Sequence, residues 1–337
     1  MPGDLELWKD RYFAKFRGIP GQNRRQLNLL MTKVVSLGVH IIDVHGYPVS
    51  EVPPGQGLAL LKQIRFTVAG TAAGTSIDMA KLGLDVSAMG AIGQDEIGDF
   101  LIATMQRFGV DTTNLVRKTH AQTSCTMLPI RPNGELTIDD IDSEVIAAAQ
   151  FLHIGGAPLM LKFDGEPASK VLKSAKERGI TTTYDLLGIP KPNLSDLIKV
   201  CLPYVDFFMP NYEEAVMICG LASIDDILRW CLDQGARHVV VRLGEKGCTV
   251  GWLENGTLKR FNTPAFEVSV VDSTGCGDAY NAGFIKGLSL GWELEECSRL
   301  GCACGGLVIQ GLGSDAGIEN FDQVMKFAQT TKLKHTH

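Results

Sequence analysis

Hydrophobic and polar positions along this chain alternate between two periods, which predicts strands that alternate with helices. Short apolar or β-branched runs, several of them ending in glycine, are typical of buried strands. Such runs occupy residues 33–38, 151–156, 181–185, 205–211 and 238–244, and another strand ends at 90–93. Apolar residues at helical spacing predict helices over residues 76–81, from 279 onward and over 300–309. This alternation favours an α/β architecture.

One stretch combines all three signals: a predicted buried strand at 266–271, a glycine-containing turn, and the start of a helix. The first N–H groups of a helix have no intrahelical partner, and the helix dipole adds partial positive charge there. An anion, most often phosphate, is the natural occupant of such a turn. Gly275 and Gly277 allow a backbone path and a close approach that a Cβ would hinder.

Asp278 follows this turn, where its carboxylate would repel a bound anion. The position is explained if a hydroxyl must lose a proton beside the phosphate, with Asp278 as the general base. The N–H groups of the turn would then stabilise charge that develops in the transition state. Alternatively, Asp278 caps the helix, since Asp is favoured near helix starts. The local residues leave both alternatives open.

Composition and charge limit the class of protein. With 337 residues, 45% of them hydrophobic, the chain can bury a large core. A net charge of −6 argues against nucleic-acid binding, and no apolar run reaches the roughly 18 residues of a membrane span. Nine cysteines without a C-x-x-C motif fit reduced thiols. Together with a mixed, acidic N-terminus unlike a signal peptide, this predicts a cytoplasmic protein whose partner is a small molecule.

Residues 272–278 resemble the D-[ST]-T-G-[AC]-G-D signature of the ribokinase-like (PfkB) carbohydrate kinases. Further motifs of that family follow in the expected order. They are G-x-x-x-x-D at 38–43, a glycine-rich turn and helix at 70–83, G-x-D-x-x-G at 93–98, N-x-x-E at 211–214 and a strand-turn at 243–247. The resemblance covers about residues 32–327.

The resemblance implies a three-layer α/β/α core with a mostly parallel central sheet and a small β-sheet lid. The kinase domain would span residues 31–330, between an N-terminal extension at 1–30 and a tail at 331–337. The lid would come from about residues 44–58 and 118–140. In the second of these segments, Pro132-Asn133-Gly134 is a strong hairpin signal, and Pro48 to Gly57 predicts a loop or edge hairpin. Lid strands of two copies are expected to be able to pair into a homodimer.

The same resemblance implies an ATP-dependent phosphotransferase that acts on a hydroxyl of a sugar or sugar-like molecule. Asp278 would be the base and the N–H groups of Gly275, Cys276 and Gly277 the anion hole. The remaining roles are implied as follows: acceptor binding by Asp43, Gly70, Thr71 and Gly74; nucleotide binding by Asn211, Arg242, Gly244 and Gly277; Mg²⁺ binding through water by Glu214; and K⁺ binding by Asp272 and Thr274.

Local alternatives stand beside several of these roles. Asp43 is also a good turn cap, and Glu214 a capping-box glutamate. Arg242 would either pair with phosphate or face solvent, and His40 and His45 are expected to be structural imidazoles. Cys302 and Cys304 are expected to pack within a helix rather than bind metal.

The chain also departs from the family pattern. Ile41 stands where Asn is common, and Leu186-Leu187 interrupts an Asp-Pro-Asn motif, so the acceptor is left open between sugars and nucleosides. A catalytically silent binding protein is the alternative from another class. A dinucleotide oxidoreductase is excluded by the absence of Gly-x-Gly-x-x-Gly after the first strand, and a Walker-type NTPase by the absence of its motif.

Overall fold

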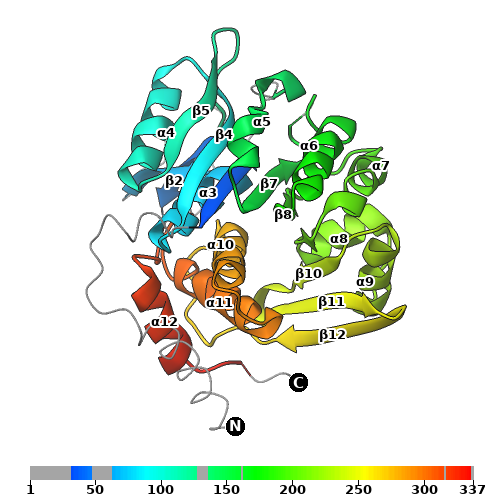
Figure 1. Cartoon of the computed structure of the whole chain (residues 1–337). Coiled ribbons are helices and arrows are strands. Elements are labelled where there is room, and N and C mark those ends of the chain that lie inside the picture. Colours follow the sequence, from blue (N-terminus) through cyan, green and yellow to red (C-terminus); the bar gives the residue numbers. More distant parts are fainter. Residues whose placement is uncertain (1–31, 48–62, 127–135, 161, 315, 335–337) are drawn as a thin grey trace, which may run out of the picture.

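The structure is a computed structural model that describes residues 32–47, 63–126, 136–160, 162–314 and 316–334. Within these residues, a nine-stranded sheet has the order β12-β11-β10-β9-β8-β7-β1-β4-β5, and a second sheet has the order β3-β2-β6 (Figure 1). Strands β1, β4, β5, β7, β8, β9 and β10 run parallel to one another. Strand β11 is antiparallel to both of its neighbours, β10 and β12. The predicted α/β class with a mostly parallel central sheet is therefore confirmed.

The large sheet consists of β1 Lys33–Gly38, β4 Asp85–Gly93, β5 Asp111–Lys118, β7 Phe151–Ala157, β8 Thr181–Leu186, β9 Phe207–Phe208, β10 His238–Arg242, β11 Cys248–Glu254 and β12 Thr257–Thr263. The small sheet consists of β2 Ile41–Tyr47, β3 Gln63–Ala69 and β6 Cys125–Thr126. The helices are α3 Thr71–Lys81, α4 Glu96–Arg107, α5 Ser143–Ala147, α6 Glu166–Glu177, α7 Leu194–Lys199, α8 Tyr212–Cys219, α9 Ile224–Asp233, α10 Cys276–Ser289, α11 Leu294–Val308 and α12 Phe321–Thr330. Three 3₁₀ turns lie at Ile138–Asp140, Leu202–Tyr204 and Gly244–Lys246.

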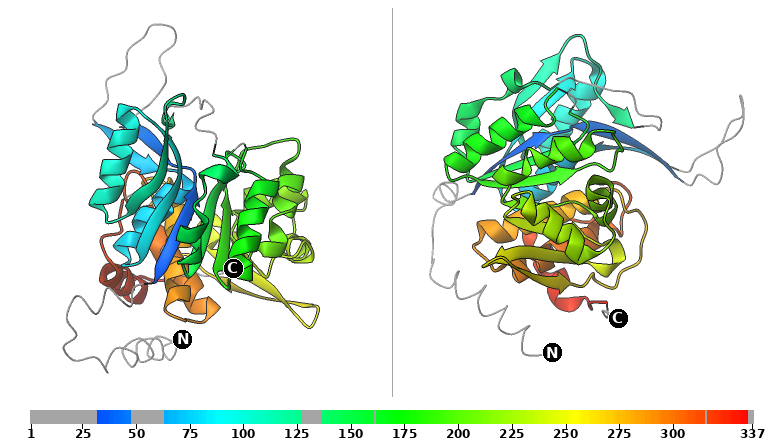
Figure 2. Two further views of the ribbon diagram at one scale, coloured as in Figure 1. Left: turned by 45° about the horizontal axis from the view of Figure 1, so that its top comes forward. Right: turned by 90° about the vertical axis from the view of Figure 1, so that its right-hand side faces the viewer.

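Two apolar cores cover the two faces of the large sheet, which makes three layers. One core takes side chains from α3, α4, α10, α11 and α12, and the other takes them from α5 to α9 (Figures 1 and 2). Every residue of β7 is buried, as expected for a central parallel strand with helices on both faces. Cys302 and Cys304 belong to the first core, where the Cβ of a residue at Gly283 would lie 2.8 Å from the Cys304 sulfur.

Glycines at the carboxyl ends of β1 and β7 let these strands approach each other closely. Gly38 has a φ of +146°, and a Cβ at this position would overlap the carbonyl oxygen of Gly155. The backbone N–H of Val39 donates to that same oxygen at 3.1 Å. The predicted strand at 33–38 is confirmed with its bounds, and its closing glycine is required by this contact.

The small β-sheet that the resemblance implied is present, but of the described part of the second expected lid segment only β6 joins it, and Ile138–Asp140 is a 3₁₀ turn. Strand β2 pairs antiparallel with β3 and parallel with β6. The first lid segment starts at Ile41 rather than near residue 44, and it extends to Ala69. The hairpin expected around residues 132–134 and the whole loop expected at 48–57 lie outside the described residues. Strand β3 is an edge strand with exposed Ile64 and Phe66, which is compatible with pairing between two copies. The homodimer through the lid stays a prediction.

Several predicted elements are wrong in kind or extent. The helix expected over 300–309 spans Leu294–Val308. Residues 266–271 do not form a buried strand: Phe266 makes one isolated bridge to Leu333, while Val270 and Val271 are 67% and 58% exposed. The strand expected at 205–211 shortens to Phe207–Phe208, because the chain turns into α8 immediately afterwards. The helix expected from Ser76 begins at Thr71, since Gly70 with a φ of 93° already serves as its N-cap.

His40 is buried behind the end of β1 and is structural, as the sequence predicted. It is 3% exposed, and Nδ1 lies 2.8 Å from the Gly38 carbonyl oxygen. Burial lowers the pKa of His40 from 6.5 to about 4, although the bond to Gly38 opposes the shift. The folded protein therefore holds this imidazole neutral.

We expect this histidine to make stability depend on pH. Because the folded pKa lies below the unfolded one, the unfolded chain binds the proton more tightly, and stability falls as the pH drops from 6.5 towards 4. The expected loss approaches 3 kcal/mol, at about 1.4 kcal/mol per pKa unit. Urea unfolding at several pH values should show a flatter dependence in His40→Gln than in wild type. The exposed His120→Gln is the control, and an unchanged slope in His40→Gln would contradict the expectation.

Candidate active site

The turn before α10 is held by one carboxylate. Asp272 Oδ1 accepts hydrogen bonds from the backbone N–H of Thr274 at 2.9 Å and from its hydroxyl at 2.8 Å. Asp272 Oδ2 accepts one from the N–H of Gly313 at 3.0 Å. Gly275 is the N-cap of α10, with a φ of 79°, and a Cβ there would overlap the side chain of Ser314. The turn therefore requires glycine at this position for two separate reasons.

The turn predicted to form the anion cup lies at the start of α10. The N–H of Cys276 makes a 3.3 Å bond to the carbonyl oxygen of Ser273. For the N–H of Gly277, the part of the chain that the structure describes provides no backbone acceptor. Together with the helix dipole, this end of α10 favours negative charge.

Asp278 lies in the first turn of α10, but it does not cap the helix. The N-cap is Gly275 and no side chain caps it, so the capping alternative is excluded. Asp278 is 8% exposed and lies against α3, where a Cβ at Gly74 would be 2.8 Å from Asp278 Oδ2. Gly74, predicted to lie in a turn that binds the acceptor, is thus a residue inside α3 whose missing side chain makes room for this carboxylate.

The electrostatic environment of Asp278 makes it a strong proton acceptor. Burial raises its pKa well above the ordinary value of 3.8, and the negative charge of Asp185 adds to the shift while Arg242 opposes it. Asp78 of α3 and Asp43 of β2 raise this pKa further. A carboxylate with a raised pKa beside an anion cup is the arrangement that a general base needs.

Arg242 does not face solvent, because its side chain is 11% exposed. Its guanidinium makes two bonds to Asp185, Nη2 to Oδ1 at 2.8 Å and Nη1 to Oδ2 at 3.3 Å. Nη1 also donates to Asn281 Oδ1 at 3.3 Å, and Nη2 lies 3.5 Å from Glu214 Oε2. Pairing of Arg242 with a nucleotide phosphate stays a prediction. The Nη1 and Nη2 donors needed for that pairing are turned towards Asp185, Asn281 and Glu214.

Asn211 and Glu214 form the capping box that the sequence offered as the local alternative. Asn211 Oδ1 accepts from the N–H of Glu214, and Glu214 Oε2 accepts from the N–H of Asn211, both at 2.8 Å. Burial raises the pKa of Glu214 to about 7, opposed by Arg242 and assisted by Asp185. The capping box turns the Glu214 carboxyl towards the ends of β8 and β10. Glu214 can therefore cap α8 and still offer a carboxylate oxygen to Mg²⁺, so the predicted Mg²⁺ role stays a prediction.

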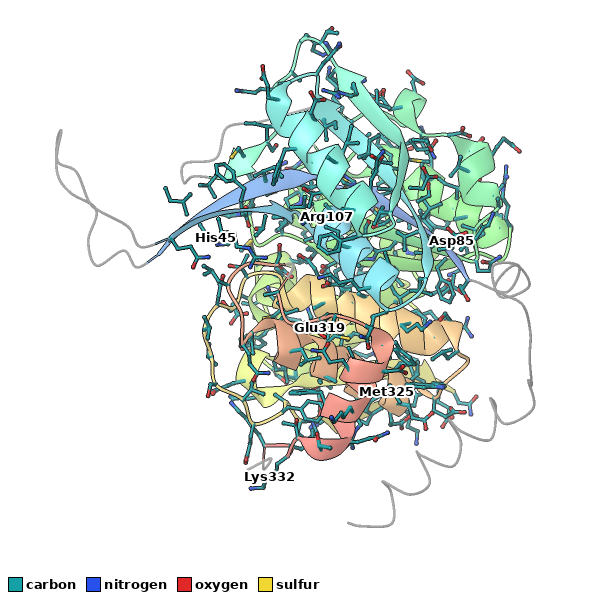
Figure 3. The ribbon with its side chains drawn as sticks, turned by 90° about the vertical axis from the view of Figure 1, so that its left-hand side faces the viewer. His45, Asp85, Arg107, Glu319, Met325 and Lys332 are labelled. Carbon is teal, nitrogen blue, oxygen red and sulfur yellow. The ribbon has the colours of Figure 1, made fainter. Side chains whose placement is uncertain are left out.

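The residues predicted to bind the acceptor lie in the small sheet and at the start of α3. Asp43 lies within β2, opposite Thr67 of β3, rather than in a turn after the first strand, so the turn-cap alternative is wrong. Thr71 is buried as the first residue of α3, next to the N-cap Gly70. His45, labelled in Figure 3, bonds Thr67 through Nε2 at 3.0 Å and places Nδ1 3.8 Å from Asp272 Oδ2. The lid and the turn before α10 therefore meet at this histidine.

Two of the residues that surround Asp278 were not predicted. Asp185 was recognised only as the end of a strand, although an Asp at the carboxyl end of a parallel strand is a signal for a ligand-side position. Asn281 lies three residues after Asp278, so helical spacing places both on one face of α10. By contrast, Gly244 and Lys246 form a 3₁₀ turn directly after β10, as the strand-turn motif predicted.

None of the helices in the described residues is both long and apolar enough to cross a membrane.

The comparisons decide the family. A family model described as pfkB family carbohydrate kinase matches residues 31–320. The chain belongs to this family. A 5-dehydro-2-deoxygluconokinase of Clostridium perfringens is 24% identical, over 95% of this chain and 98% of the relative.

Solved structures show the same ribokinase-like fold. A putative ribokinase II from E. coli in complex with ATP and Mg²⁺ has a TM-score of 0.74 at 19% identity, covering 89% of this chain and 99% of that one. An aminoimidazole riboside kinase from Salmonella enterica, complexed with its riboside and an ATP analogue, has a TM-score of 0.71 at 21% identity, covering 88% and 99%. The resemblance read from the motifs is thus confirmed for family and fold.

We expect Gly74→Ala to impair this carbohydrate kinase without unfolding it. Alanine is favoured over glycine inside a helix by roughly 1 kcal/mol, but its Cβ would displace the Asp278 carboxylate. A displacement of about 1 Å can reduce turnover about 100-fold. Thermal unfolding and kcat measure the two effects. Gly306→Ala in α11, which would press only on side chains of Phe327 and Phe266, is the control. Unchanged turnover in Gly74→Ala would contradict the expectation.

Proposed function

We propose that the protein transfers the terminal phosphoryl group of ATP to a hydroxyl of a sugar or sugar-like molecule, with Asp278 as the base. One observation carries the proposal: a buried carboxylate of raised pKa lies in the first turn of α10, directly after the backbone donors of Gly275 to Gly277. Asp43, close enough to Asp278 to raise its pKa, would orient the acceptor from the lid side.

The proposed reaction needs few groups. Asp278 takes the proton of the acceptor hydroxyl, and the resulting oxygen attacks the terminal phosphorus of ATP. A phosphorus–oxygen bond to the acceptor forms while the bond to ADP breaks, and ADP leaves with the electron pair. The N–H groups of Gly275, Cys276 and Gly277 stabilise the charge on the transferring group.

The nucleotide would lie over the carboxyl ends of β9 and β10, beside Asn211, Arg242 and Gly244, where open α/β sheets bind ligands. The Glu214 carboxyl lies at this edge of the sheet, 3.5 Å from Arg242 Nη2, and hard oxygen donors suit Mg²⁺. Glu214 would hold this ion through water, and Mg²⁺ when bound would neutralise charge on the phosphates.

The proposal also includes K⁺ near Asp272 and Thr274. Asp272 Oδ1 accepts two bonds from Thr274, whereas Oδ2 accepts one from the N–H of Gly313 and has a second lone pair to offer. An ion there would reinforce the turn that forms the anion cup.

The acceptor class can be tested on the wild-type protein. ADP release should be stimulated by at least one member of a panel of free sugars and sugar acids. The panel includes 5-dehydro-2-deoxygluconate, after which the Clostridium relative is named. A nucleoside panel tests the alternative within the family, and buffers containing Na⁺, K⁺ or NH₄⁺ test the monovalent ion. Equal rates in the three buffers would remove K⁺, and no stimulation by any acceptor would favour a silent binding protein.

We expect Asp278→Asn to abolish most turnover while ATP still binds. Loss of a general base costs about 100- to 10,000-fold in kcat. Since the base acts only when ionised and its pKa is raised, wild-type kcat/KM should fall as the pH drops from a midpoint well above that of an ordinary carboxyl. The raised pKa also means that the ionised carboxylate destabilises the folded state as the pH rises, so Asp278→Asn should stabilise the protein more at pH 8 than at pH 5. Near wild-type turnover would remove the base assignment.

A further inference from the structure

The side chains of Arg242, Asp185 and Asn281 form a closed network that takes no part in the proposed proton transfer. Asp185 accepts both arms of the guanidinium fork, at 2.8 and 3.3 Å. Asn281 accepts from Nη1 at 3.3 Å and donates through Nδ2 to Asp185 Oδ2 at 2.6 Å. Each member thus contacts the other two, and the side-chain rotamers of all three are held by the fold before any ligand arrives.

This network connects the sheet to α10. Asp185 is the penultimate residue of β8, Arg242 ends β10, and Asn281 lies in the second turn of α10. A Cβ at Gly277 would lie 2.8 Å from Arg242 Nη1, so the guanidinium rests directly against the start of α10. It therefore lies beside the residue that supplies an anion-cup N–H and precedes Asp278.

The charges that face Asp278 come from four other elements. Asp185 of β8, Asp43 of β2 and Asp78 of α3 carry negative charge towards it, and on its own helix the Cys276 thiol also lies near. Arg242 of β10 is the cation among the groups that shift its pKa. Without that cation, burial and like charge would both favour the protonated carboxyl, which cannot accept a proton.

We propose that Arg242, braced by Asp185 and Asn281, is a positioning residue for the base: its contact with Gly277 aligns the start of α10, and its buried charge opposes protonation of the Asp278 carboxylate. This inference rests on the proposed function for its catalytic consequence. Arg242 acts through Asp278 rather than on the substrate, since its Nη donors are turned to Asp185, Asn281 and Glu214.

The first test measures kcat/KM against pH for Arg242→Gln and Asp185→Asn. Removing the cation should move the acid limb to higher pH, by about one to three units, and removing Asp185 should move it to lower pH. Turnover of Arg242→Gln should accordingly recover as the pH is raised. Its affinity for ATP should stay within about threefold of wild type, whereas the loss of a charged hydrogen bond to ATP would weaken binding roughly tenfold. A phosphate contact would instead show weaker ATP binding and no recovery at high pH, which would overturn the proposal.

Because a single substitution leaves a buried charge without its partner, either variant can fail to fold. The double variant Asp185→Asn/Arg242→Gln removes one charge of each sign, and Arg242→Lys keeps the cation but loses the fork. We expect the double variant to have an acid limb between those of the two single variants, and Arg242→Lys to stay nearer to wild type than Arg242→Gln. Arg237→Gln, which removes a 70% exposed arginine paired with Asp206, is the matched control and should not move the limb.

A second readout needs no turnover. Carboxyl ¹³C NMR of aspartate-labelled protein, with the Asp278 signal assigned by its loss in Asp278→Asn, follows this titration directly. Opposite shifts in Arg242→Gln and Asp185→Asn support the inference, and equal midpoints in wild type and Arg242→Gln overturn it. If wild-type protein phosphorylates no acceptor while the NMR midpoints move as expected, the proposed function fails and the electrostatic role of Arg242 stands.

Discussion

A buried positive charge has to be balanced at the point where the central sheet meets α10, and much of the site follows from this constraint. Asp185 approaches Arg242 from one strand, Glu214 from the helix after another, and Asn281 from α10. A buried guanidinium is tolerated only with such partners, because its desolvation costs several kcal/mol. The contacts with Arg242 thereby fix the positions of β8, α8 and α10 relative to the end of β10.

The same constraint explains the glycines on either side of Asp278. Gly277 leaves room for the guanidinium below the start of α10, and Gly74 leaves room for the Asp278 carboxylate beside α3. Neither glycine has a positive φ, so backbone strain does not require them. They are required by what lies against them, which is a charged group in both cases. Close packing of two helices and a strand end thus depends on two missing methyl groups.

The sequence predicted those features whose cause is local. The strand at 33–38 was placed correctly because its β-branched run and closing glycine are both local signals. The strand expected at 266–271 failed because alternation alone does not supply a neighbouring strand. After β12 the backbone makes one isolated bridge, from Phe266 to Leu333, and single N–H bonds from Glu267 to Lys332 and from Val271 to Ile309. The start of α3 was missed because Gly74 lowers helix propensity, while packing against Asp278 overrides it. The pairing of Arg242 with Asp185, 57 residues apart, has no periodic signature at all.

One loop, residues 312–314, contacts both the small sheet and the turn before α10. The lid carries Asp43, and the backbone of β3 accepts a bond from Ser314 at 2.8 Å, while Arg65 donates to the carbonyl oxygen of Leu312. Ser314 also lies where a Cβ on Gly275 would go, and Asp272 bonds the N–H of Gly313. A lid that shifted to admit a larger acceptor would therefore pull on residues 312–314, and through them on the turn that precedes Asp278. Under the proposed function, acceptor size and the geometry of this turn would thus not be independent, because a single loop contacts both the small sheet and the turn.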